Sequence, residues 1–391
     1  AAGLAAAFGA PIGGVLFSLE EASSYWSPKV TWRCFLCAAT ASFTLAQMDR
    51  SVEPGMLTFT GLSPSPASDW LWQLPFLALL GGLAGCLGAA FNLARTWVQR
   101  VRVPKQRHAL RVLEALGVMA ASLAVMFACS FYAGACMERP KAWEPDPNGN
   151  FGWNKHHYGI EFPSARAANG TCGPGTYNDL ATMYFSPPQE TVKKWFGTGE
   201  DPTVEGSVRF TRLSLLIYST TFLALMSAAA GIAVPSGMFL PSIMVGSSFG
   251  LLSGLLLQAG LGAEWRIQPG VYSLVGATAV LGGVFRSSIS LVVIIVEGTG
   301  GIDYLFGVIL AIVMSHWVGH FIHPEGVYET ELEQDNGVTF LRREPPRALT
   351  LLTAAHIMAS PPLGVRQVES VGEVARLLKS TTHNGFPVLG G

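Results

Sequence analysis

Charged residues are scarce in this chain, at 13% of 391 residues, whereas soluble globular domains carry about 25%. The composition is 50% hydrophobic, and the mean hydropathy is +0.37. The few charges lie between long apolar runs, which is the pattern of a polytopic membrane protein. The net charge is −1, so the balance of charge gives no reason to expect nucleic acid as a partner.

The chain also lacks the ligand spacing of metal sites. Four of its six cysteines lie in or beside apolar runs and are interpreted as packing residues: Cys34, Cys37, Cys86 and Cys129. Three histidines could share one helix face, yet we expect no metal on them: His316, His320 and His323. The clustered polar residues of an intramembrane enzyme are missing as well. The sequence therefore predicts neither an enzyme nor a metal or organic cofactor.

Seven apolar runs predict an all-α membrane domain: 29–48, 74–98, 110–133, 213–233, 238–262, 270–297 and 302–322. Several exceed the roughly 20 residues that cross a hydrocarbon core. Others are interrupted by Gly and Pro, as in "FGAPIGG", "GIAVPSGMFLPS" and "VLGGVF". Broken helices at membrane depth are typical of transporter binding sites. The alternative is that these glycines only permit close packing of helices.

Loop charges predict the topology and the domain boundaries. The segment 99–111, "QRVRVPKQRHALR", is basic and has no acid, so the positive-inside rule assigns it to the cytoplasm. One crossing later, the polar segment 134–207 is expected to face the lumen or exterior, where "NGT" makes Asn169 a glycosylation candidate. We expect a membrane domain over 1–331, a linker over 332–348 and a partial α/β domain over 349–391. The start without Met predicts that further sequence precedes residue 1.

Two cysteines fall in the polar segment that the topology assigns to the lumen or exterior, Cys136 and Cys172. Such compartments allow disulfides, so we predict that the two are bonded. The alternative is a pair of free thiols.

The stretch "GIAVPSGMFLPS", residues 231–242, predicts an anion site. Pro235 disfavours helix in the residue before it, and Gly237 permits unusual dihedrals. A helix is then expected to begin near Met238, where unpaired N–H groups and the positive dipole end can hold an anion without a basic side chain. No Lys or Arg occurs between Arg212 and Arg266, which suits an ion that must not be held tightly.

These residues resemble the ClC family of chloride channels and proton-coupled chloride exchangers. "GMFLP" is similar to the anion-site motif of that family, "GAPIGGVLFSLEE" to a second signature, and "GVYETEL" to the segment that carries the pore tyrosine. Residues 353–388 look like the beginning of a first CBS domain. The motif "SLEE", followed by Ser, an aromatic residue and Trp, and the paired loop cysteines are most similar to the lysosomal and late-endosomal branch.

The resemblance implies a role for each matching residue. Gly237 and the backbone amides of Met238 and Phe239 would bind the central chloride, and Tyr328 would add a hydroxyl from the cytoplasmic side. Without the family, Tyr328 would be interpreted as an interfacial aromatic anchor. Glu21 would be the internal proton-transfer glutamate.

Glu20 and Glu21 point about 100° apart if they are helical, so they cannot share one role. Periodicity does not choose between them; only the resemblance assigns Glu21 to the proton path and leaves Glu20 to a polar interface or a neighbour. Burial should raise the pKa of a relay carboxylate. The alternative is two carboxylates that mark a helix end. Glu297 is expected at a helix end or in an interhelical hydrogen bond, and Arg286 is expected to reach the membrane interface.

The resemblance therefore implies a chloride/proton exchanger of an intracellular, lysosomal or endosomal membrane, with broken and tilted helices and the partial CBS domain in the cytoplasm. A passive, voltage-gated chloride channel of the same family is the alternative. The partners would be chloride, protons, the lipid bilayer, a second copy in a homodimer and an accessory subunit, with a nucleotide at a complete CBS pair. The family's gating glutamate and outer anion-site residue are expected upstream of Ala1, so we expect that the chain alone could not transport.

Overall fold

A computed structural model divides the chain into two compact units, Ala1–Thr339 and Phe340–Gly391. Each unit is described by itself. The structure describes residues 1–21, 23, 27–48, 71–102, 107–138, 160, 162–167, 170, 172, 175–198, 210–234, 236–262, 265, 267–299, 304–336, 352–358, 363–381 and 385–389.

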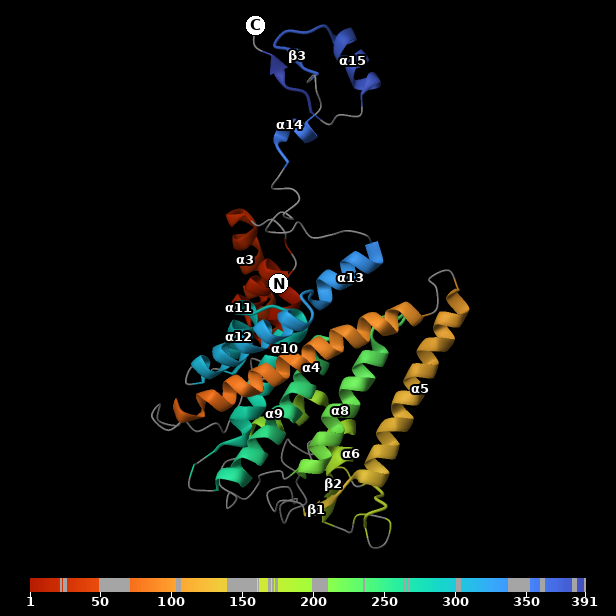
Figure 1. Ribbon diagram of the computed structural model, residues 1–391, viewed down its shortest axis with the longest axis vertical. Coiled ribbons are helices and arrows are strands. Elements are labelled where there is room, and N and C mark those ends of the chain that lie inside the picture. The colour runs from red at the N-terminus through yellow and green to blue at the C-terminus, as the bar shows by residue number, and fades with distance from the viewer. Residues whose placement is uncertain are drawn as a thin grey trace. The chain divides into compact units, whose positions relative to one another are not determined.

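The first unit is built almost entirely of helices (Figure 1). Its helices are α1 (Ala2–Phe8), α2 (Pro11–Glu21), α3 (Pro28–Met48), η2 (Leu71–Gln73), α4 (Leu74–Val101), α5 (His108–Ala133), α6 (Asp179–Phe185), α7 (Pro188–Phe196), α8 (Arg212–Ala229), α9 (Phe239–Leu261), α10 (Pro269–Phe285), α11 (Ile289–Thr299), α12 (Leu305–Ile322) and α13 (Val327–Asn336). Its two short strands are β1 (Cys136–Glu138) and β2 (Thr176–Asn178).

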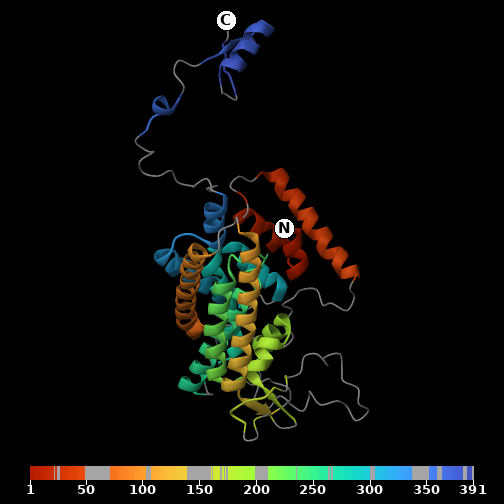
Figure 2. The same cartoon turned by 90° about the vertical axis from the view of Figure 1, so that its right-hand side faces the viewer.

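Among the described residues, five helical stretches are long and apolar enough to cross a membrane: Leu71–Val101, His108–Ala133, Arg212–Ala229, Phe239–Leu261 and Leu305–Leu332. They differ in how much the rest of the protein covers them. In the most apolar 18-residue stretch of α5 no residue is buried, whereas in that of α9 61% of the residues are buried. Figure 1 shows α5 at the edge of the bundle next to α8, and the two helices also lie side by side in Figure 2. The apolar surface of α5 therefore suits lipid, while α9 belongs to the core.

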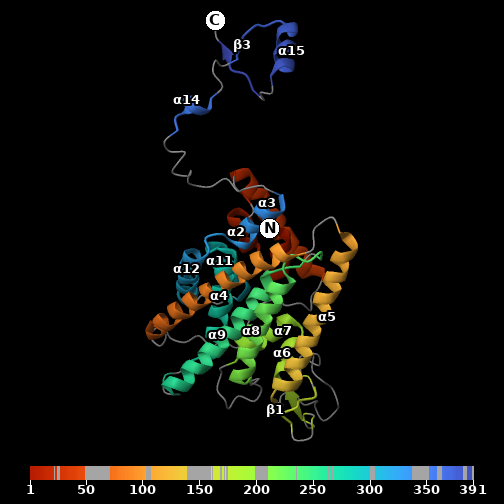
Figure 3. The ribbon, with the colours of Figure 1, turned by 45° about the vertical axis from the view of Figure 1, so that its right-hand side comes forward.

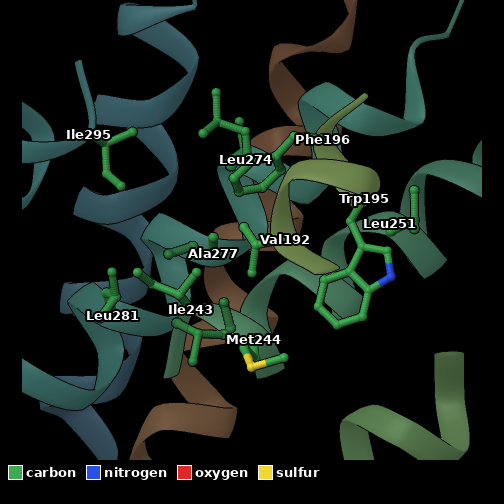
Figure 4. Packing of buried hydrophobic residues seen from close by; sticks show 14 of the residues in the cluster. Val192, Trp195, Phe196, Ile243, Met244, Leu251, Leu274, Ala277, Leu281 and Ile295 are labelled. Atoms are coloured by element: carbon green, nitrogen blue, oxygen red, sulfur yellow. The ribbon is translucent and has the colours of Figure 1, made fainter. Parts of the chain in front are cut away.

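The core lies where α9 packs along α10 and where α7 closes over both helices (Figure 4). Every residue of α10 is buried, and the helix is apolar on every side, as expected for a helix surrounded by protein. From α7, the fully buried Trp195 contacts the ring of Tyr218 on α8. The predicted polar segment 134–207 is thus more than a loop, because part of it folds into helices that complete this core.

A row of glycines lets α4 approach its neighbours closely. Gly81 and Gly85 face the backbone of α12, and Gly88 faces Gly283 of α10; a Cβ at any of the three would collide with backbone atoms. Figures 1 and 3 show the long α4 (orange) running beside α12 (blue). These glycines therefore serve close packing, and so does Gly283 of the broken run "VLGGVF", which meets the backbone of Ala84 and Gly85.

The predicted run 270–297 is not one helix. It divides at Arg286, which adopts the left-handed conformation (φ 62°) and ends α10, and α11 begins three residues later. The structure shows which groups Arg286 contacts. Its Nη2 donates to the carbonyl oxygens of Gly319 and His323, at 2.8 and 3.0 Å, and so satisfies the C-terminal end of α12. A non-glycine residue at a positive φ costs free energy, which these hydrogen bonds offset.

The structure contains a disulfide between Cys136 and Cys172, the pair expected from the sequence. Cys136 begins β1, which pairs antiparallel with β2, and β2 leads directly into α6. The disulfide therefore lies beside this strand pair, just before α6 begins. Asn169, the predicted glycosylation site, lies outside the described residues. Of the cysteines expected in packing roles, Cys37 and Cys86 are exposed and free.

The second unit contains α14 (Ala354–Ile357), β3 (Val365–Arg366), α15 (Val371–Ser380) and β4 (Val388–Leu389). β3 and β4 pair in parallel, and α15 lies between them in the sequence, which makes a small β–α–β unit. The Ser370 side chain caps α15 by accepting from Glu373 N–H. No residue of α15 is buried, so its apolar stripe has no partner within the described part of this unit.

Candidate functional site

The N-terminus of α9 offers free backbone donors. After α8 the chain turns at Gly231 (φ 76°) and enters α9 at Phe239, with Met238 as an N-cap residue whose side chain does not cap the helix. The first intrahelical bond runs from Ser242 N–H to the Met238 carbonyl, at 3.2 Å. In the described part of the chain, the N–H groups of Met238 and Phe239 have no acceptor. They are therefore available to an anion, which the dipole of α9 also favours.

Gly237 contributes space at this position. A glycine permits unusual dihedrals here, but Gly237 is not among the described glycines with positive φ. Nothing lies within 4 Å of the place that its Cβ would occupy. Among the described residues, the space beside Gly237 at the start of α9 is therefore open. Pro235, which was expected to break the helix here, lies outside the described residues.

Five aromatic rings surround the start of α9. Phe239 packs against Phe8 (4.7 Å between ring centroids), Phe17 (6.1 Å) and Phe285 (5.7 Å). Tyr328 packs against two of the same rings, Phe17 (6.1 Å) and Phe285 (5.4 Å). This aromatic cluster joins α1, α2, α9, α10 and α13. It brings together Phe239 and Tyr328, which lie 89 positions apart in the sequence.

The position of Tyr328 is fixed through α13. Arg95 on α4 is only 3% exposed, and its Nη1 donates to the carbonyl oxygen of Val327 at 3.0 Å. Its Nη2 lies 3.3 Å from Oε2 of Glu331, one turn further along α13. Two contacts from one guanidinium thus hold the first turn of α13 against α4. Tyr328 lies within electrostatic range of the Glu21 carboxylate, and its hydroxyl has no hydrogen-bond partner within the described residues.

Glu20 caps the N-terminus of α11. Its carboxylate accepts from the Ser287 hydroxyl (2.7 Å) and from the backbone N–H groups of Ser288 and Ser290, both at 3.0 Å. Burial raises the pKa of Glu20, but these hydrogen bonds to the charged form outweigh burial, so the pKa falls below its ordinary value. Glu20 is therefore a structural anion at a helix start.

Glu297 caps the N-terminus of α2. It lies near the end of α11, and its two oxygens accept from Ile12 N–H (3.2 Å) and Gly13 N–H (2.9 Å) at the start of α2. The sequence prediction of an interhelical hydrogen bond is confirmed. Because Glu20 lies in the last turn of α2 and caps α11, each of these two helices caps the other.

Glu21 has different surroundings. It is the last residue of α2, outside the five stretches long enough to cross the membrane. Burial raises the pKa of Glu21 to about 8, and repulsion from the carboxylates of Glu20 and Glu329 acts in the same direction, while a hydrogen bond with Ser287 opposes both. A group with this pKa can take up and release a proton near neutral pH. The two adjacent glutamates are thus separated in role by what each contacts.

The histidines do not form a metal centre in the part of the chain that the structure describes. The rings of His316 and His320 stack at 6.1 Å, as expected for one helix face. In that part, no three His, Cys, Asp or Glu side chains come together in a way that could hold a metal ion.

Several residues of the site were not expected from the sequence. Nothing in the sequence singles out Phe8 and Phe17, and only the fold shows that they meet at Phe239. Arg95 lies inside the predicted apolar run 74–98, and its contacts with α13 depend on the fold. The serines of "RSSIS" carried a usable signal, because such residues before an apolar run are typical of a helix start, but that signal does not say which carboxylate would meet them.

Comparisons with known proteins agree with this geometry. A family model described as "Voltage gated chloride channel" matches residues 1–320. H(+)/Cl(-) exchange transporter 7 of Homo sapiens is 32% identical over 400 residues, which is 100% of this chain and 46% of that protein. Chloride channel protein A of Dictyostelium discoideum is 33% identical over 421 residues, 100% of this chain and 47% of that protein. The chain thus spans about half the length of the curated relatives that it matches.

Solved structures support the fold. The crystal structure of a eukaryotic CLC transporter matches 98% of this chain and 54% of that chain, with a TM-score of 0.58 and 22% sequence identity. The relatives are named as transporters and channels rather than as enzymes. The family match and the apolar helices together make the chain an integral membrane protein.

Proposed function

The chain belongs to the voltage gated chloride channel family, and from this membership we propose that it contributes the central part of the pathway of a chloride/proton exchanger. Gly237, Met238, Phe239 and Tyr328 bind chloride, and Glu21 transfers protons. The similarity to a protein named as an H(+)/Cl(-) exchange transporter supports exchange over passive conduction.

One observation carries the proposal: a carboxylate with a raised pKa interacts electrostatically with Tyr328, whose ring belongs to the aromatic cluster at the start of α9. A channel needs only the amides and an open path. Exchange also needs a group that binds a proton near neutral pH beside that path. Glu21 has the required pKa of about 8 and lies within electrostatic range of Tyr328, which packs in the aromatic cluster around Phe239.

The proposal is tested by measuring chloride and proton movement together in vesicles that contain the full-length protein. We expect an outward chloride gradient to drive protons inward in the wild type. Glu21→Gln, which keeps the shape but cannot ionise, should still move chloride and should lose proton movement. Glu20→Gln is the matched control. The Glu20 carboxylate caps α11, so its substitution should leave proton coupling intact.

The outcomes separate the alternatives. Chloride movement without protons in the wild type would favour the passive channel. Undiminished proton movement in Glu21→Gln would refute its assignment, and loss of coupling only in Glu20→Gln would transfer the relay to that residue.

For the assembly we propose a homodimer in a lysosomal or endosomal membrane, as the similarity to the transporter branch suggests. Large apolar side chains on α12 are exposed, including Trp317 (71%) and Phe321 (91%), and a second copy or lipid would cover them. An accessory subunit belongs to the same proposal. Cross-linking in native membranes measures the oligomeric state directly.

We further propose that the second unit is the beginning of a cytoplasmic CBS domain. The parallel pairing of β3 with β4 and the helix between them support this. The uncovered apolar stripe of α15 supports it as well, because a larger domain would bury that stripe. A nucleotide would then bind at a complete CBS pair, which equilibrium dialysis of the cytoplasmic region with ATP can test.

A further inference from the structure

Four polar side chains follow one face of α4 toward its C-terminal end: Asn92, Arg95, Gln99 and Arg102, the last being the C-cap residue. Their spacings of three, four and three residues place them on the same side of the helix, because an α-helix has 3.6 residues per turn. We call them the polar face of α4. Its two halves contact different parts of the candidate chloride site.

The first half, Asn92 and Arg95, holds the segment that carries Tyr328. Nδ2 of Asn92 donates to the carbonyl oxygen of Glu325, two residues before α13, at 3.4 Å. Nη1 of Arg95 donates to the carbonyl oxygen of Val327 at 3.0 Å. Both donors are buried, at 3% exposure each. The backbone on the N-terminal side of Tyr328 is therefore fixed to α4.

The second half, Gln99 and Arg102, holds the turn that leads into α9. Nη2 of Arg102 donates to the carbonyl oxygens of Ala228 and Ala230, and so satisfies the C-terminal end of α8. At Gly231 the backbone then adopts a positive φ of 76°. The Gln99 side chain lies against this residue, since a Cβ there would be 3.1 Å from its Cγ. The start of the turn is thus fixed to α4 as well.

The guanidinium of Arg102 is itself held from α5. Its Nη1 donates to Oε1 of Glu114 at 2.9 Å, and the two side chains are only 11% and 22% exposed. A guanidinium offers its donors in fixed directions, so contacts with α8 and α5 together define where it lies. An ammonium group has no such planar array of donors. The arrangement therefore depends on arginine and not on positive charge alone.

The two contacts of the polar face border one cavity. Arg95 and Glu331 line it from the contact between α4 and α13, whereas Gly231 and Met238 line it from the turn and the start of α9. An ion that binds both the amides at Met238 and the hydroxyl of Tyr328 needs each donor within about 3 Å at once. The spacing between the two sides therefore decides whether both can contact it.

We propose that the polar face of α4 sets the spacing between the two halves of the chloride site, and that Arg102 is the positioning residue for the α9 half. Arg102 acts through the end of α8 and the turn, and it does not contact the ion. The inference rests on the proposed function, because it assumes that chloride binds between Met238 and Tyr328.

The experiment is a double-mutant cycle of Arg102→Gln and Tyr328→Phe, with chloride binding to the full-length protein measured by titration calorimetry. Arg102→Gln should raise the Kd about three- to tenfold, which is at most the loss of one hydrogen bond to a charged group. In that background Tyr328→Phe should weaken binding clearly less than in the wild type, because a displaced site no longer uses the hydroxyl fully. Residues that act through one network deviate from additivity in this way.

Arg100→Gln is the matched control. Arg100 is an exposed basic residue of the same helix end, so its substitution should leave the Kd and the Tyr328→Phe effect unchanged. Glu114→Gln is a milder second variant, which keeps Arg102 and removes only its ion pair. It should raise the Kd in the same direction by a smaller factor, and it keeps the inference testable if Arg102→Gln does not fold.

Arg102→Lys separates positioning from charge. Lysine keeps the positive charge but cannot reach α8 and Glu114 in the same geometry, so it should restore chloride affinity only in part. Full restoration by lysine would overturn the inference and would leave a long-range charge effect as the explanation. Addition of NaNO₃ would then also weaken the effect of Arg102→Gln, because salt screens such a charge.

The inference is also overturned if Arg102→Gln binds chloride with wild-type affinity, or if its effect and that of Tyr328→Phe simply multiply. Failure of the proposed function looks different, because the wild type would then bind no chloride. Binding that Tyr328→Phe weakens and Arg102→Gln leaves unchanged refutes the positioning role alone.

Discussion

Glu20 and Glu297 each cap the N-terminus of the helix that carries the other. Glu20, near the end of α2, accepts from the N–H groups that start α11, and Glu297, near the end of α11, accepts from those that start α2. Neither helix is longer than 11 residues, so each depends on the other for its end groups. The two therefore form one structural unit.

The first prediction concerns the stability of this unit. Glu20→Ala and Glu297→Ala should each lower the free energy of unfolding by about 1–3 kcal/mol, because each leaves N–H groups without an acceptor. The double variant should lose less than the sum, since releasing one end loosens the pair that the other end supports. Thermal unfolding in detergent measures all three. Glu138→Ala, an exposed carboxylate in β1, is the control; strictly additive losses would contradict the coupling.

The second prediction concerns pH. The pKa of Glu21 is about 8 in the folded protein and 4.5 in the unfolded chain, so the folded state binds more protons between these values. Stability should therefore decline as pH rises from about 4.5 through 8. Glu21→Gln removes this titration and should flatten the decline, as a melting series across that window would show. Equal slopes in the wild type and the variant would show that Glu21 does not titrate there.

The third prediction concerns Tyr328. Tyr328→Phe keeps the ring in the aromatic cluster and removes only the hydroxyl, so the fold should be unchanged. Chloride binding should weaken roughly tenfold, as expected for the loss of one hydrogen bond to a charged group. Titration calorimetry with chloride measures this change. Tyr272→Phe is the matched control, because its hydroxyl binds Gln73 away from α9; equal losses in both variants would exclude a specific role.

The fourth prediction concerns the disulfide. Cys136 and Cys172 are separated by 36 positions. Opening a loop of this size by Cys136→Ser should lower the free energy of unfolding by roughly 3–4 kcal/mol. Cys86→Ser, at an exposed free thiol, should have no comparable effect. If the two variants melt at the same temperature, the bridge contributes nothing measurable to stability.

The sequence predicted most of what depends on local pattern. Long apolar runs became helices, and the run around "GMFLPS" began a helix one residue after the expected position. The second unit contains short strands and helices, in agreement with the α/β character expected of residues 349–391. These features depend on hydropathy and on residue types within a few positions, which a single sequence contains.

What the sequence could not predict depends on distant partners. Adjacent glutamates look alike in the chain, yet Glu20 meets three serines 267 to 270 positions away while Glu21 does not share their backbone donors. Arg286 looked like a residue that would reach the membrane interface, and it binds the end of α12. The basic residues Arg95 and Arg111 reach the start of α9 only because α4 and α5 lie beside it. Tertiary contacts decided each case.

The glycine row on α4 restricts how the protein can move. At Gly81, Gly85 and Gly88 the neighbouring backbone occupies the space where a side chain would lie, so α4 cannot slide along α12 or α10 without a steric clash. Rocking of one half of the bundle against the other is thereby excluded at this contact. In the exchanger that we propose, α4, α10 and α12 would act as a fixed frame, and the transport cycle would proceed by displacements of single side chains and of short segments such as the first turn of α13.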